Sequence, residues 1–211
     1  MTRLLTAFSL LGLVALNAAC TPVGVAIGGA AMAGSTAMQE RGFEQALTDK
    51  STELSIQKKV IDADFETFQR VDVTVVEGRV LLTGVVPNAE DRVRVVEATW
   101  QTEGVVEVIN ELLIGADVGV INTGYDLKIE SALDLALTLD RDVAAVNYIS
   151  DATGGTLYLM GIAQNQAELD RVIAHARTIE RVRRVVSYVL IKDSPERVAL
   201  LKRLAEVKVQ E

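Results

Sequence analysis

The chain has 211 residues, of which 49% are hydrophobic and 24% are charged, and this balance is typical of a folded protein rather than a disordered one. Its 29 acidic residues outnumber its 21 basic residues, so the formal net charge is −8 at pH 7. An acidic chain is a poor match for a general nucleic-acid binder, because such proteins carry a surplus of Lys and Arg.

Residues 1–19 have the order of a secretory signal peptide. A lone Arg3 is followed by an uncharged run, Leu4 to Leu16, and then by the small residues Ala18 and Ala19. The uncharged run is too short for a membrane-spanning helix, which needs about 20 apolar residues. We therefore expect cleavage before Cys20.

Cys20 is the only cysteine of the chain. In an oxidising compartment an unpaired cysteine is usually avoided, paired between chains, or modified. Its place resembles the lipid acceptor of a bacterial lipoprotein signal, although Asn17 stands where that signal favours Leu. We predict lipidation at Cys20, and cleavage without lipid or an uncleaved anchor remain the alternatives.

Residues 20–45 are rich in Gly and Ala. Glycine disfavours a stable helix in water, so this segment is interpreted as a flexible tether between the lipid and the folded part. Plain disorder is one alternative. In the other, Gly24 and Gly28, four residues apart, would let helices approach closely in or near a membrane.

The folded part consists of two copies of one unit. Residues 77–114 align without a gap on residues 154–191, with the offset of 77 that separates Gly84 from Gly161. Each copy reads helix, strand, strand, helix, strand. In the first copy we expect a helix over 54–63, strands over 71–76 and 79–86, a helix that begins after Asn88 and ends at Gly104, and a strand over 105–114.

Local chemistry supports these elements. Gly78 after Glu77 supplies a tight turn between the two strands, and Asn88 is a suitable cap for the following helix. We expect Val93, Val96 and Trp100 to form the inner face of that helix. The last strand follows a helical crossover, so the three-stranded sheet is mixed, with two helices on one face.

The motifs "GRVLLTG" with "GVVEVINEL" and "GTLYLMG" with "RVRRVVSYVL" resemble the BON domain. Arg181 and Ser187 depart from the family pattern in the second copy. The resemblance implies an α+β fold of two tandem αββαβ domains. We divide the chain into 1–19 (signal peptide), 20–45 (tether), 46–116 (first BON domain), 122–192 (second BON domain) and 193–211 (C-terminal helix).

Two BON domains behind a lipidated cysteine are similar to the dual-BON outer-membrane lipoproteins of Gram-negative bacteria. This resemblance implies a non-enzymatic protein, anchored by lipid to the periplasmic face of the outer membrane, that supports membrane integrity and binds anionic phospholipid through its second domain. Thr21, rather than Asp, after the cysteine resembles lipoproteins that are sent on to the outer membrane.

The first helix of the second copy, 125–140, is more apolar than its counterpart. At 100° per residue, one stripe faces the sheet and consists of Ile129, Ala132, Leu133 and Ala136. Leu127, Leu135 and Leu137 fall outside this stripe. The outer leucines need a second apolar partner: a bilayer, the other domain or the C-terminal helix. The lipid-binding candidates are one aromatic, two apolar and three basic residues: Tyr125, Leu127, Leu137, Arg171, Arg177 and Arg181.

The arginines allow two readings. Each basic residue near an anionic membrane contributes roughly 1 kcal/mol, but the same arginines suit an ordinary solvated helix face. The C-terminal helix, with Val198, Leu201 and Ala205 as its expected apolar stripe, has three possible positions: on the second domain, on another protein or on the membrane.

No catalytic group or metal site is expected. His175 is the only histidine and has no second ligand at a metal-binding spacing, and G-x-S-x-G is absent. We therefore expect no enzyme activity, cofactor, small-molecule substrate or nucleic-acid partner. Two function classes remain: a membrane-binding lipoprotein, and a scaffold lipoprotein that binds an envelope protein and contacts lipid only through its acyl anchor.

Overall fold

The computed structural model describes residues 39–65, 69–115 and 123–209. The signal peptide, Cys20 and the tether up to residue 38 lie outside the described residues, so their assignments stay predictions.

The first domain contains α2 (Phe43–Ala63), β1 (Val71–Val76), β2 (Arg79–Val86), α4 (Ala89–Trp100), β3 (Glu107–Asn110) and β4 (Leu113–Ile114). β2 is the central strand. It pairs antiparallel with β1 and parallel with both β3 and β4. The expected last strand over 105–114 is therefore interrupted, and α2 begins eleven residues earlier than the helix expected at Leu54.

The second domain repeats this arrangement with α5 (Thr123–Leu139), the short helix η2 (Ala145–Asn147), β5 (Tyr148–Thr153), β6 (Thr156–Ala163), α6 (Gln166–Thr178), β7 (Arg184–Ser187) and β8 (Leu190–Ile191). α7 (Pro195–Val209) follows. β6 is central, antiparallel to β5 and parallel to β7 and β8. The expected fold class, two αββαβ domains with mixed sheets, is confirmed.

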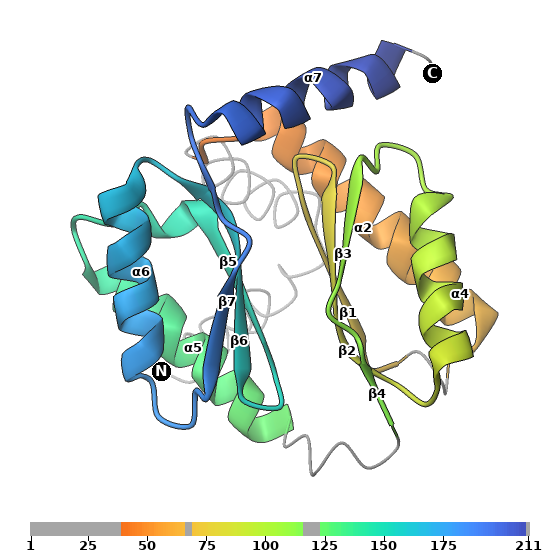
Figure 1. Ribbon diagram of the computed structural model, residues 1–211, viewed down its shortest axis with the longest axis horizontal. Coiled ribbons are helices and arrows are strands. Elements are labelled where there is room, and N and C mark those ends of the chain that lie inside the picture. Colours follow the sequence, from red (N-terminus) through yellow and green to blue (C-terminus); the bar gives the residue numbers. More distant parts are fainter. Residues whose placement is uncertain (1–38, 66–68, 116–122, 210–211) are drawn as a thin grey trace, which may run out of the picture.

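The two sheets face one another, and the helices of each domain cover the outer side of its own sheet (Figure 1). A hydrophobic cluster from both domains fills the space between the sheets: Val76, Leu81, Tyr158, Met160 and Ile162. The neighbours of Leu81, Val80 and Leu82, point instead into the core of the first domain. The central strands are therefore buried on both faces, and all eight residues of β2 are buried.

Gly84 and Gly161 are required by a close approach of the backbone. A Cβ atom on Gly84 would lie 1.9 Å from the carbonyl oxygen of Arg70, and one on Gly161 would lie 2.0 Å from that of Asn147. Both glycines also have positive φ values, 98° and 141°. These contacts explain why the apolar motif ends in Gly in both copies.

Two expected helix faces are wrong. In α4 the buried residues are Asp91, Val95 and Thr99, whereas Val93 and Trp100 are about half exposed. In α7 the buried residues are Arg197, Leu200 and Leu204, whereas Val198 and Leu201 are exposed. In both helices polar side chains occupy inward positions. The most apolar stripe of the sequence is therefore not the face that is buried.

Candidate functional site

The outer face of α5 is an uncovered apolar surface. Asp126, Ile129, Leu133 and Leu137 form the inner face against the sheet. On the outside, Leu127, Leu135 and Leu139 are 62%, 61% and 72% exposed. Lys128 lies among them, and small or uncharged side chains fill much of the remaining outer face: Ser131, Ala132 and Thr138. The expectation that Ala132 faces the sheet is therefore wrong. Exposed Asp134, seven residues after Leu127, adds one acidic side chain to this face. A helix that is apolar on both faces needs a second apolar environment in addition to its own core.

Leu137 does not belong to this surface. It is only 2% exposed and lies in the core cluster of the second domain, so the expectation that it falls outside the inner stripe is wrong. The inner arc of α5 is wide, because Ile129 and Leu137 lie about 80° apart on the helix and both face inward. Leu139, which was not among the expected lipid-binding residues, is exposed in its place. Its position twelve residues after Leu127 puts it on the outer arc.

Tyr125 and Arg181 meet at the beginning of α5. The guanidinium carbon of Arg181 lies 3.5 Å from the centre of the Tyr125 ring, and the Lys128 ammonium lies 5.3 Å from the same centre. Both are cation–π contacts. Tyr125 and Arg181 are 56 residues apart in the sequence, and the fold brings them together. Exposed Leu127 is on the same end of α5 but about 160° around the helix from Tyr125.

Arg181 has an unusual backbone. Its φ is 72°, in the left-handed region that is disfavoured for residues other than glycine. The equivalent position in the first domain is Gly104, with φ 78°. The second domain thus keeps a long cation at a position where glycine would be relaxed. The side chain is about half exposed, and its ion pair with Glu180 is loose at 3.8 Å.

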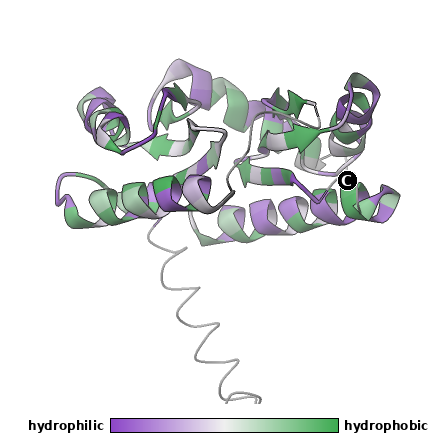
Figure 2. Ribbon diagram, turned by 90° about the horizontal axis from the view of Figure 1, so that it is seen from below, coloured by the Kyte–Doolittle hydropathy of each residue, from purple (hydrophilic) through white to green (hydrophobic). Residues whose placement is uncertain are grey.

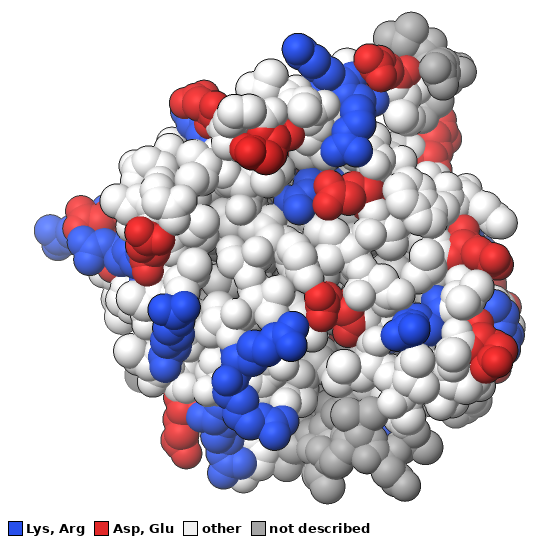
Figure 3. Space-filling model, viewed as in Figure 1, with Lys and Arg blue, Asp and Glu red and all other residues white. Residues whose placement is uncertain are grey.

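The other arginines separate into two groups. Arg177 is exposed on the last turn of α6, and Figure 3 shows basic side chains gathered over this end of α6 and the start of β7. Arg171 instead pairs with Asp142 at 2.5 Å and with Asp140 at 3.7 Å. Asp140 follows the C-terminal end of α5, about 20 Å along the helix from Tyr125. Arg171 is therefore not part of the Tyr125 cluster.

Like charges gather where the two domains meet. The Asp151 carboxylate on β5 accepts a hydrogen bond of 2.8 Å from the Thr83 hydroxyl on β2. Burial raises the pKa of Asp151 to about 6, helped by the negative charge of Asp72. Burial also raises the pKa of Glu130 on α5 to about 7, and Asp151 adds to this shift.

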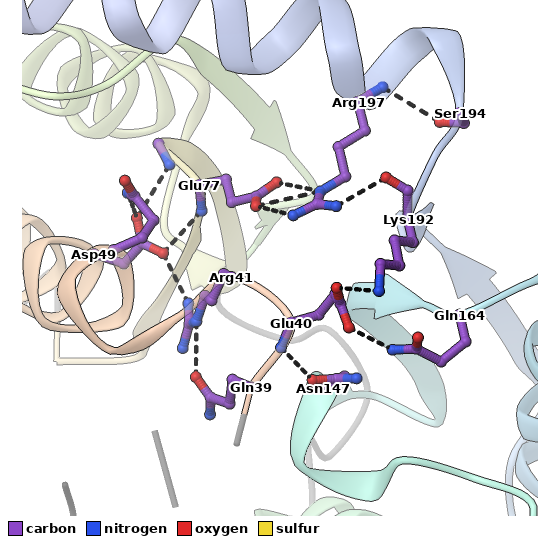
Figure 4. Close-up of polar contacts among 12 residues, drawn as sticks. Gln39, Glu40, Arg41, Asp49, Glu77, Asn147, Gln164, Lys192, Ser194 and Arg197 are labelled. Carbon is purple, nitrogen blue, oxygen red and sulfur yellow. Dashed lines mark hydrogen bonds and ion pairs between the residues drawn. The ribbon is translucent and has the colours of Figure 1, made fainter. Parts of the chain in front are cut away.

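Polar contacts at the opposite end tie the domains together (Figure 4). Arg197 on α7 donates a bidentate pair of hydrogen bonds to the buried carboxylate of Glu77, from Nη2 at 2.6 Å and from Nε at 3.0 Å. Glu40, just before α2, pairs with Lys192 at 2.7 Å, and its backbone N–H donates to Asn147 at 2.8 Å. The C-terminal helix therefore contacts the first domain as well as the end of the second, and the first domain was not among its three expected positions.

His175 has a structural partner. Its Nε2 lies 2.7 Å from the Asp140 carboxylate. Within residues 39–65, 69–115 and 123–209, no group of three His, Cys, Asp or Glu side chains is arranged to hold a metal ion. In the same ranges no helix has the length and apolar character needed to cross a membrane.

Comparison with known proteins supports the architecture. The family model described as "BON domain" matches residues 48–116 and again residues 125–193. The chain belongs to the BON-domain family. The tandem BON chain is 38% identical over 128 residues to an uncharacterized protein in the gshII 5′ region of Anaplasma centrale, covering 60% of this chain and 85% of that one.

Two further relatives have descriptive names. The BON chain is 28% identical to the outer membrane lipoprotein DolP of Haemophilus influenzae, over 79% of this chain and 88% of that one. It is also 28% identical to a 21 kDa hemolysin of Actinobacillus pleuropneumoniae, over 61% of this chain and 67% of that one.

Proposed function

We propose that this BON protein is a non-enzymatic lipoprotein, anchored through Cys20 to the periplasmic face of the outer membrane, where it binds anionic phospholipid and supports membrane integrity. The observation that carries the proposal is the outer face of α5. It joins exposed Leu127, Leu135 and Leu139 to a cationic end made by Lys128 and Arg181 around Tyr125. An apolar strip with basic residues at its edge is typical of helices that lie in a membrane interface.

The lipoprotein part of the proposal rests on sequence. The signal-like residues 1–19 end directly before Cys20, and the DolP relative is named an outer membrane lipoprotein. The two supports are independent, because one is the pattern of the leader and the other is the similarity of the folded domains.

The strength of the expected contact fits an auxiliary role. Full burial of a leucine side chain contributes about 1.5–3 kcal/mol, and each basic residue near an anionic surface contributes about 1 kcal/mol. The three leucines are already partly buried, so a few leucines and two or three cations give a weak and reversible contact. Stable anchoring usually needs two signals, and the acyl chains at Cys20 would be the other.

The test is flotation of the unacylated chain 20–211 carrying Cys20→Ser, with vesicles that contain or lack phosphatidylglycerol and cardiolipin, at low and high salt. This chain keeps Glu40, whose contacts with Lys192 and Asn147 a shorter fragment would lose. We expect binding that needs anionic lipid and weakens with salt. Leu127→Gln with Leu139→Gln should reduce binding without changing the thermal midpoint. An absence of binding under all conditions would contradict the lipid-binding part of the proposal.

A second candidate function is a scaffold for an envelope protein. The observation in its favour is a pair of exposed apolar residues on α4, Val93 at 53% and Trp100 at 52%. Exposed tryptophan is a frequent anchor of protein interfaces. If Trp100→Ala abolishes an envelope phenotype while vesicle binding is unchanged, the scaffold function is favoured.

A further inference from the structure

The first domain also carries an exposed apolar stripe, on α2. Phe43, Leu47, Leu54 and Ile61 are 45%, 61%, 55% and 40% exposed. Their separations of four, seven and seven residues place them on one line along the helix, away from the buried Ile56 and Val60. The stripe therefore runs along nearly the full length of α2 and is not needed for the core of its own domain.

α2 and α5 lie in the same layer of the molecule. Figure 2 shows them along one edge, α5 on the left and α2 on the right, whereas α4 and α6 lie toward the opposite edge. The repeat shows that the two outer faces correspond. With the offset of 77, Leu47, Leu54 and Ile61 fall on positions 124, 131 and 138, all of which are exposed on α5.

The charge beside the α2 stripe differs from that beside α5. Lys50 pairs with Glu53 at 2.5 Å, and Lys58 pairs with Asp62, so four of the charged residues beside the stripe form neutral pairs. The end of α5 instead carries Lys128 and Arg181 in contact with an aromatic ring. Attraction of α2 to a surface would thus come from apolar burial, with little dependence on salt.

We infer that α2 is a second membrane contact, so that the protein lies on a phospholipid bilayer through the first helices of both domains. The inference rests on the proposed function of α5. The bilayer is the occupant because the stripe continues the layer of α5, and because the chain from Cys20 enters the described structure at Gln39, four residues before α2 begins. An extended chain spans at most about 3.5 Å per residue, so a lipidated Cys20 would hold α2 within about 80 Å of the membrane.

The experiment compares matched double variants in the Cys20→Ser chain 20–211. Leu47→Gln with Leu54→Gln removes the centre of the α2 stripe, and Val93→Gln with Trp100→Gln changes equally exposed residues on α4. We expect the α2 variant to bind anionic vesicles roughly tenfold more weakly, by the same factor at low and high salt. The α4 variant should bind like the parent chain, and circular dichroism should show an unchanged thermal midpoint for both.

A second readout follows the position of α2 directly. The Cys20→Ser chain has no other cysteine, so Leu54→Cys or Val93→Cys can carry a single environment-sensitive fluorophore. A blue shift with vesicles at position 54 and none at position 93 supports the inference. Parent-like binding of the α2 variant together with no shift at position 54 overturns it, while loss of binding in Leu127→Gln would still uphold the proposed function. If the parent chain itself fails to bind, both ideas are wrong.

Discussion

Arg197 and Glu77 form a buried ion pair that joins the last helix to the first β-hairpin. The side chains of the pair are 10% and 2% exposed, and the two residues are 120 positions apart in the chain. The Arg197 Nη1 also donates to the carbonyl of Lys192 at 2.8 Å, so the guanidinium contacts both the first domain and the end of the second. This arginine links the two domains and α7 in one network.

Replacing Arg197 with Ala should destabilise the protein by about 3–5 kcal/mol, because Glu77 would remain buried without its partner. Chemical denaturation of the chain 20–211 measures the change. Lys202→Ala, an exposed substitution on the same helix, is the control and should stay within about 0.5 kcal/mol of the parent. Equal stability of the two variants would mean that the Glu77 pair contributes little.

Stability should fall as the pH rises through the weakly acidic range. In the folded protein the pKa of Asp151 is raised to about 6 and that of Glu130 to about 7. Raised carboxyl pKa values mean that the folded state holds protons that the unfolded chain has lost above pH about 4. The resulting loss of folding stability grows from about pH 4 to pH 7 and is complete above pH 7.

Asp151→Asn tests this dependence, since an amide oxygen can still accept the hydrogen bond from Thr83. We expect the variant to raise the thermal midpoint at pH 8 and to change it little at pH 4. Exposed Asp170→Asn on α6 is the control. A parallel shift of Asp151→Asn at both pH values would argue against a charge effect.

Arg181→Gly should separate lipid binding from folding. Glycine adopts the left-handed backbone without strain, so the substitution stabilises the folded state by roughly 1 kcal/mol. Loss of the cation–π contact with Tyr125 destabilises it by about 0.5–1 kcal/mol. Stability measured by denaturation should therefore stay nearly constant. Binding to anionic vesicles should weaken at low salt only. Arg171→Gln, whose native partners are Asp140 and Asp142, should leave vesicle binding unchanged.

Leu137 and Leu139 should behave in opposite ways. Leu137→Ala empties part of the core of the second domain and should cost about 2–5 kcal/mol in the free energy of unfolding. Leu139→Ala changes a side chain that is 72% exposed and should be within about 0.5 kcal/mol of the parent. Urea denaturation of both variants decides the assignment, and a large loss for Leu139→Ala would mean that this residue is packed in solution.

Much of each domain follows from local sequence chemistry. The duplication of Gly84 as Gly161, the Asn88 cap and the β-branched strands predict the αββαβ order, because turns, caps and strand propensities act over a few residues. The structure confirms the Asn88 cap, whose side chain accepts from the Asp91 N–H. The BON resemblance supplied the expected role of the second domain.

Helix faces were less predictable. Leu137 faces inward, and Val93, Trp100, Val198 and Leu201 are exposed although they lie on expected apolar stripes. Hydrophobic periodicity ranks positions by apolar character alone, whereas the final orientation also depends on buried polar contacts such as the pair of Arg197 with Glu77.

The sequence by itself determined the two domains, the order of helices and strands along each of them, and the apolar excess of the 125–140 helix. The tertiary structure decided that the sheets face one another, that α7 crosses to the first domain, and that Tyr125 meets Arg181. One signal for the sheet packing was present, since "RVLLTGVV" and "TLYLMGIA" are apolar at nearly every position, as in strands buried on both faces. That pattern indicates that the second face of each sheet is also covered. Which surface covers it depends on the fit between distant parts of the chain, and no short stretch of sequence contains that information.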